Sequence, residues 1–199
     1  LIYVKKKSKS IYRKKPYKKN LFIIGFLFGF GYYLSGVYWI SYSLTFDESF
    51  KILIPFSIIL IPLFLALFFG VTTLIVGQFL NYNFSSILLF SGCLALSDFI
   101  KGKILTGFPW NLWAYSWSWV VEILQLLNII GLYAFNLIVI TIFTIPAILF
   151  FKNDIKKKFL TLSISLALIF SIFIYGTFSI NKNKGILNFI KKENKIYAK

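Results

Sequence analysis

The side chains best suited to chemistry in this sequence lie within residues 93–116. Asp98 and Lys101 are three positions apart, so on a helix they lie one turn from each other and can form an ion pair. Cys93 is the one cysteine of the chain, which has no histidine. A thiol becomes reactive when a nearby cation or helix end favours the thiolate, but Cys93 lies inside the apolar run 88–96. We therefore expect Cys93 to be structural, and we predict no catalytic residue, metal site or cofactor in this chain.

An aromatic loop, residues 105–116, follows the ion pair. Gly107 and Pro109 end a helix and favour a turn. The loop also carries rings of the kind that lie at the headgroup layer of a bilayer, so we expect it to lie on the membrane surface or dip into it. The candidate residues for contact with lipid or substrate are Asp98, Lys101, Phe108, Pro109, Trp110, Tyr115 and, in an earlier segment, Trp39.

Each of these candidates has a structural alternative. An ordinary aromatic belt would explain the rings, although a belt does not need so ordered a pattern, and Trp39 would then be a membrane anchor. A purely structural ion pair would explain Asp98 and Lys101. Glycines at 25, 29 and 36 recur at spacings of four and seven, which predicts close helix packing rather than a site.

The composition is that of an integral membrane protein. Of the 199 residues, 58% are hydrophobic and 14% are charged, and the mean hydropathy is +0.79. The formal net charge of +16 could suggest nucleic acid as a partner. The basic residues, however, form short blocks beside apolar stretches, where they act as topology signals and headgroup contacts. We therefore expect no nucleic-acid partner.

Five apolar stretches are long enough to cross a bilayer as helices: about 21–44, 52–79, 84–100, 131–151 and 159–180. We predict an all-α polytopic transmembrane helix bundle with an interfacial helix or loop after the third span. Residues 1–20 would form a basic cytoplasmic segment, 21–180 the transmembrane domain and 181–199 a linker. The apolar run at 1–4 resembles the end of an earlier span, so we expect the chain to be a fragment.

The distribution of lysine predicts the orientation. Basic blocks at 5–20 and 152–158 fall on one side of the predicted spans, which the positive-inside rule makes cytoplasmic. The loop at 101–118 and the C-terminus would then lie outside. The lysines of the C-terminal tail oppose the rule, but a long translocated domain largely escapes it.

Two ordered motifs resemble the membrane domain of bacterial apolipoprotein N-acyltransferase. The first is the glycine-punctuated stretch 25–39, which ends in Ser-Gly-x-x-Trp. The second runs through Asp-x-x-Lys-Gly at 98–102, Thr-Gly-Phe-Pro-Trp at 106–110 and Tyr-Ser at 115–116. With Gly131 and Asn136 in the next span, the resemblance covers about 25–180.

The chain departs from the family pattern at three positions of the second motif. Lys101 stands where the family usually has Arg, Ala114 where it usually has Gly, and Asp98 where Glu is common. A Lys keeps the positive charge but lacks the bidentate fork of Arg. A phosphate-binding role for Lys101 is therefore weakened.

The resemblance implies an enzyme of the bacterial inner membrane. In the family, a Glu, Lys and Cys triad of an external nitrilase-like domain performs catalysis, and this chain lacks that domain. The implied reaction transfers an acyl chain from a phospholipid, through a thioester, to the α-amino group of a diacylglyceryl apolipoprotein. The implied partners are these two substrates and the membrane lipids, and the fragment alone would be inactive.

Two functions of other classes stay open, a non-catalytic membrane scaffold and a small transporter. Transporters usually show inverted repeats and ionisable residues near the midplane. Neither pattern is evident in this sequence. A nitrilase-like continuation of the reading frame would favour the acyltransferase.

Overall fold

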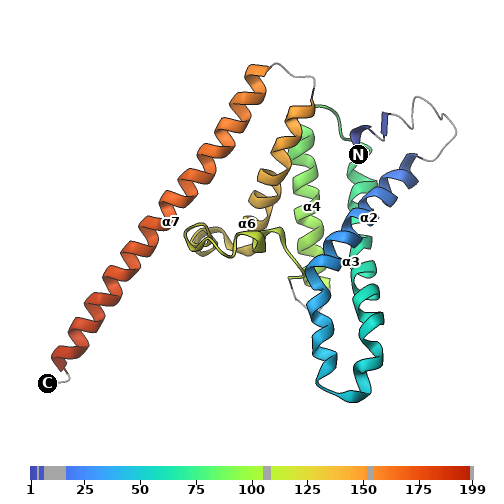
Figure 1. Ribbon diagram of the computed structural model, residues 1–199. Helices are drawn as coiled ribbons and strands as arrows, with labels where there is room; N and C mark the ends of the chain where they lie inside the picture. Colours follow the sequence, from blue (N-terminus) through green and yellow to red (C-terminus); the bar gives the residue numbers. More distant parts are fainter. Residues whose placement is uncertain (4, 7–16, 105–108, 152–154, 198–199) are drawn as a thin grey trace. The chain divides into compact units, whose positions relative to one another are not determined.

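The structure is a computed structural model that describes residues 1–3, 5–6, 17–104, 109–151 and 155–197, with side chains described as far as 185 (Figure 1). Within these residues the chain is helical and contains no strand. The helices are α2 (Tyr17–Val37), α3 (Ile54–Val76), α4 (Phe84–Ile104), α5 (Val121–Leu124), α6 (Leu127–Thr144) and α7 (Ile155–Tyr197). Four 3-10 segments join or extend them: η1 (Tyr38–Thr45), η2 (Glu48–Leu53), η3 (Trp113–Trp117) and η4 (Ile145–Phe150).

Five helical stretches in the described part of the chain are long and apolar enough to cross a membrane: Tyr17–Thr45, Glu48–Val76, Phe84–Ile104, Leu127–Phe150 and Ile155–Gly185. The predicted all-α polytopic fold is confirmed. The third span continues past the predicted end at 100, because the charge of Lys101 is enclosed and paired. Helix α7 is continuous to Tyr197, so the segment predicted as a linker has a helical backbone.

The chain divides into two compact units, and each is described by itself. Unit 1 contains Leu1–Leu112 and Ala147–Asn153, and unit 2 contains Trp113–Pro146 and Asp154–Lys199. Unit 1 therefore holds α2, α3 and α4, whereas unit 2 holds α5, α6 and α7.

Unit 1 is built on a helical hairpin of α2 and α3, which lie side by side in Figure 1. Gly25 and Gly29 face α3: a Cβ on Gly25 would collide with the side chain of Thr73, and one on Gly29 would lie 2.7 Å from Cβ of Phe69. The hydroxyl of Thr73 donates to the carbonyl of Leu21 at 2.9 Å. The close helix packing predicted from the glycine spacing is confirmed at these two positions.

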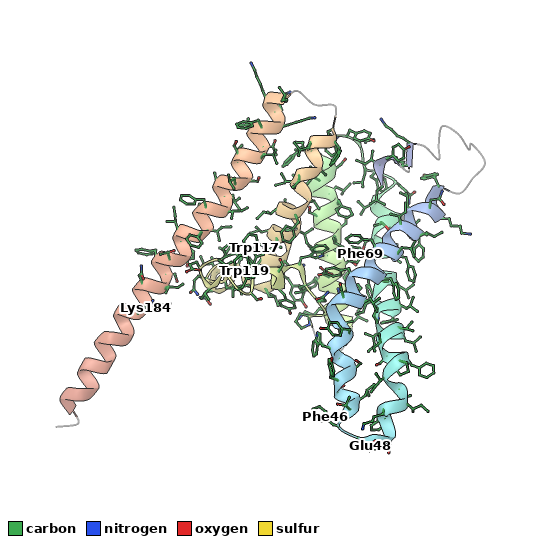
Figure 2. All side chains as sticks on the ribbon, in the orientation of Figure 1. Phe46, Glu48, Phe69, Trp117, Trp119 and Lys184 are labelled. Carbon is green, nitrogen blue, oxygen red and sulfur yellow. The ribbon has the colours of Figure 1, made fainter. Side chains whose placement is uncertain are left out.

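Short polar residues begin two of the helical segments of unit 1. Asp47 accepts a hydrogen bond from the backbone N–H of Ser49 at 2.8 Å where η2 begins. Asn83 precedes α4 and accepts from the backbone N–H of Ser86 at 3.0 Å and from its hydroxyl at 2.7 Å. Side-chain oxygens at such positions satisfy N–H groups that have no partner within the helix. Phe46 and Glu48, labelled in Figure 2, mark the turn between η1 and η2.

Unit 2 begins with the irregular segment that leads into α6. The predicted interfacial helix or loop after the third span takes the form of η3, a turn and the one-turn helix α5. Gly131 interrupts α6 with a φ of 74°, which glycine adopts without strain. Helix α5 packs on α7 at Gly176, where a Cβ would collide with the carbonyl of Glu122.

The α2–α3 contact predicts the effect of an alanine at Gly25. The added methyl group would collide with Thr73, so Gly25→Ala should lower the free energy of unfolding by about 1–3 kcal/mol. Gly31 is the matched control on the same helix, because nothing lies within 4 Å of its Cβ position. Gly31→Ala should leave stability unchanged or raise it slightly. Unfolding in mixed micelles measures both variants, and equal losses would contradict the packing account.

Candidate functional site

Three aromatic rings form the centre of the candidate site in unit 1. Tyr32 and Tyr33 are neighbours on α2, and their ring centroids are 5.2 Å apart in an edge-on arrangement. The ring of Phe69 on α3 lies 5.9 Å from that of Tyr32 and 6.1 Å from that of Tyr33. Figure 2 labels Phe69, which is almost wholly buried, and Tyr33 is completely buried. Offset contacts of this kind add to the stabilisation from burial alone.

Next to these rings lies the predicted ion pair. Nζ of Lys101 donates to Oδ1 of Asp98 at 2.8 Å, which confirms that the two residues pair across one helical turn. Nζ also donates to the hydroxyl of Tyr33 and lies 4.7 Å from the centroid of the Tyr33 ring. Asp98 is 2% exposed and Lys101 is 0% exposed. Burial of a charge is tolerated when its hydrogen bonds are satisfied, and Lys101 meets this condition through two side chains.

A second contact of α2 holds the aromatic loop at Asn111. The hydroxyl of Tyr32 donates to the backbone carbonyl of Asn111 at 2.7 Å. Asn111 has a φ of 43°, a left-handed conformation that Asn adopts more readily than most residues. Gly36 faces the same residue, because a Cβ at Gly36 would collide with the amide side chain of Asn111. Asn111 is therefore held through its carbonyl and its side chain.

In unit 2, the continuation of the loop is held by α6. The backbone N–H of Ala114 donates to Oδ1 of Asn136 at 3.0 Å, and both residues are buried. The rings of Trp113 and Trp117 lie 6.0 and 6.4 Å from that of Phe143. Ala114, the second residue of η3, is thus part of a packed structure in unit 2.

The candidates from sequence occupy three kinds of environment. Asp98 and Lys101 are buried in unit 1, where their ion pair has a structural role. Contact with substrate stays a prediction for both. Pro109 and Trp110 are half-buried, whereas Trp39 is exposed on η1 with its indole N–H donating to the carbonyl of Gly36 at 3.1 Å. The candidates that remain are Phe108, which lies outside the described residues, and Tyr115, which is 41% exposed on η3.

Tyr115 lies outside the candidate spans, and its phenol has a raised pKa. Partial burial is the main cause, and the neighbouring phenol of Tyr133 adds to it. The group therefore stays protonated at physiological pH and can donate a hydrogen bond.

No pattern in the sequence predicts the hydrogen bonds of Tyr32, Tyr33 and Asn136 described above. The partners of the two tyrosines lie 79 and 68 positions away along the chain, and no local pattern reveals such pairs. Asn136 stood out only through the family resemblance. A polar amide in an apolar span was the available signal, because a buried amide needs partners.

Cys93 lies on an apolar cavity of about 490 Å³ between α3 and α4. Most of the residues around it are apolar, with hydroxyl groups from Thr72 and Ser97 and no acid or base among them. The cavity lining therefore supplies no charged group that could activate the thiol. The part of the chain that the structure describes holds no cluster of three or more His, Cys, Asp or Glu residues.

Comparison with known proteins gives one consistent family. Residues 10–145 match the model of the apolipoprotein N-acyltransferase N-terminal domain. A Rickettsia typhi protein named apolipoprotein N-acyltransferase is 37% identical over 160 residues, which cover 80% of this chain and 32% of that protein. A Rhodopseudomonas palustris protein of the same name is 29% identical over 154 residues, 76% of this chain and 29% of the relative. This chain thus spans about a third of the length of these relatives. No solved structure matches the chain.

The buried ion pair predicts an asymmetry between single and double substitutions. Lys101→Met leaves the carboxylate of Asp98 buried without its cation, so it should lower the free energy of unfolding by about 3–5 kcal/mol. Asp98→Asn combined with Lys101→Met removes both charges and should recover much of that loss. The surface pair of Glu48 and Lys51 is the control, since Lys51→Met should change stability by less than about 1 kcal/mol. A double variant no more stable than Lys101→Met would contradict this account.

Proposed function

This chain belongs to the apolipoprotein N-acyltransferase family, and we propose that it is the membrane part of an enzyme that acylates lipoproteins. The acyl donor would be a phospholipid and the acceptor the α-amino group of an N-terminal diacylglyceryl-cysteine. The observation that carries this proposal is the match of residues 10–145 to the N-terminal domain of the family. The ordered loop motif at 106–116 lies within the matched range.

We assign the covalent steps to residues outside this chain, in a nitrilase-like domain with a Glu, Lys and Cys triad. Its thiolate would attack an ester carbonyl of the phospholipid, so that a thioester forms and a lysophospholipid leaves. The amine of the lipoprotein would then attack the thioester, which forms an amide and releases the thiol. The surroundings of Cys93 support this assignment, because nothing around its cavity activates a thiol.

The described helices would then hold the two lipid substrates at the depth of the catalytic groups. Five candidate spans anchor the chain in a membrane, which we take to be the bacterial inner membrane. Trp110 and Pro109, which are half-buried, would form with Phe108 a rim that meets the lipid. A loop held at Asn111 by both a hydrogen bond and a close side-chain contact supports this role, because substrate positioning needs a defined geometry.

Substitution of Trp110 tests the rim. In the full-length enzyme, Trp110→Ala should lower acyl transfer about tenfold, or about 1.4 kcal/mol in transition-state free energy, and should lower membrane abundance much less. Trp119→Ala is the matched control, because Trp119, labelled in Figure 2, is 79% exposed and its indole N–H donates to the nearby carbonyl of Ser116. Assays of lipoprotein acylation and immunoblots of membranes measure the two effects. Equal losses of activity and abundance for Trp110→Ala would contradict the rim.

Thiol labelling in cells tests the orientation. Ser118 and Lys157 are exposed and lie in segments that we place outside and in the cytoplasm respectively. A membrane-impermeant maleimide should label the Ser118→Cys protein in spheroplasts, whereas the Lys157→Cys protein should react only after permeabilisation. The parent protein measures the background from its own thiols. The reverse labelling pattern would show that the orientation is inverted.

A further inference from the structure

We propose that the adjacent residues Tyr32 and Tyr33 of α2 are positioning residues, whose hydroxyl groups hold the chain at Asn111 and at Lys101, on either side of residues 105–108. The loop begins after the end of α4 that carries Lys101 and reaches Asn111 ten residues later. The inference concerns the backbone at the end of α4 and at 109–112, and its consequence for acyl transfer rests on the proposed function.

The first contact is at the end of α4. The hydroxyl of Tyr33 accepts a hydrogen bond from Nζ of Lys101, whose other recorded partner is the carboxylate of Asp98. Asp98 is on the same helix as Lys101, so that pair alone does not attach α4 to anything. Tyr33 therefore supplies the link that ties the charged end of α4 to α2. All three side chains are buried, so no water can replace the link without opening the unit.

The second contact is at Asn111. The hydroxyl of Tyr32 donates to the carbonyl of Asn111, a residue with a positive φ. A non-glycine residue keeps that conformation when its surroundings enforce it. Gly36, one turn further along α2, leaves the space that the amide of Asn111 occupies. The same helix thus binds the backbone of Asn111 and accommodates its side chain.

The two contacts act together because the tyrosines are neighbours. Their rings contact each other, and both contact Phe69 of α3. Neither hydroxyl can move far without displacing these three packed rings. The distance between the two held points of the loop is consequently set by one segment of α2. Trp110 directly precedes the second held point, so its depth in the membrane follows from this arrangement.

Phenylalanine variants test this inference, because they remove the hydroxyl and leave the ring. In the full-length protein in micelles, Tyr32→Phe should speed hydrogen–deuterium exchange of the amides at 110–112 about two- to tenfold, the factor expected for one lost hydrogen bond. Gly36→Ala should have a similar effect through displacement of Asn111. Tyr33→Phe should speed exchange at the last turn of α4. The matched controls are Tyr38→Phe, at an exposed ring, and Gly31→Ala, where the Cβ has open space, and both should leave exchange unchanged.

Two further measurements separate this inference from simple destabilisation and from the proposed function. The unfolding midpoint of Tyr32→Phe should stay close to that of the parent, because a positioning role changes the loop and not the whole unit. Exchange that is unchanged at 110–112 in Tyr32→Phe, or unchanged at the last turn of α4 in Tyr33→Phe, would overturn the inference. So would exchange that rises only in step with global unfolding. Faster loop exchange with unchanged kcat/KM for acyl transfer would uphold the positioning role and contradict the proposed role of the loop in catalysis.

Discussion

The buried ion pair of Lys101 and Asp98 is the constraint around which unit 1 is organised. A charged amine with no exposure has to be surrounded by acceptors, and α4 itself supplies only the carboxylate one turn away. A second acceptor comes from Tyr33 of α2, so satisfaction of the charge requires the Tyr33 hydroxyl to lie at the charged end of α4. In a membrane the penalty for an unsatisfied polar group is high, and the requirement is correspondingly strict.

The contact between α2 and α3 is stabilised by close packing rather than by charge. Helices inside a bilayer gain little from the hydrophobic effect when they associate, because lipid tails are as apolar as their side chains. Close approach at Gly25 and Gly29 allows dispersion contacts and a hydrogen bond from Thr73 to the backbone of α2. This approach also brings Phe69 against the two tyrosines, so the glycines of α2 help to place the rings that contact the loop.

Periodicity and composition predict the parts of this arrangement that are local. Hydropathy locates the five candidate spans, the spacing of Asp98 and Lys101 predicts their pairing, and glycine spacing predicts a packed face. What escapes prediction is long-range. Which residues of α2 meet Lys101 and Asn111 depends on the register of helices that are far apart in sequence. The kink at Gly131 also escapes prediction, because a single glycine in an apolar span does not indicate that its φ is positive.

The geometry of Asn111 bears on how the aromatic loop differs from an ordinary membrane belt. A belt needs rings at the right depth and tolerates many backbone conformations, because headgroups are a mobile environment. Here Asn111 has a positive φ, its carbonyl accepts a hydrogen bond from Tyr32, and its side chain occupies the space that Gly36 leaves. A backbone conformation of this kind persists when the surrounding contacts enforce it. A backbone conformation that is enforced in this way is useful where the loop must contact a partner at a fixed position. The proposed transfer between two lipid substrates would impose that demand on the surface that presents them.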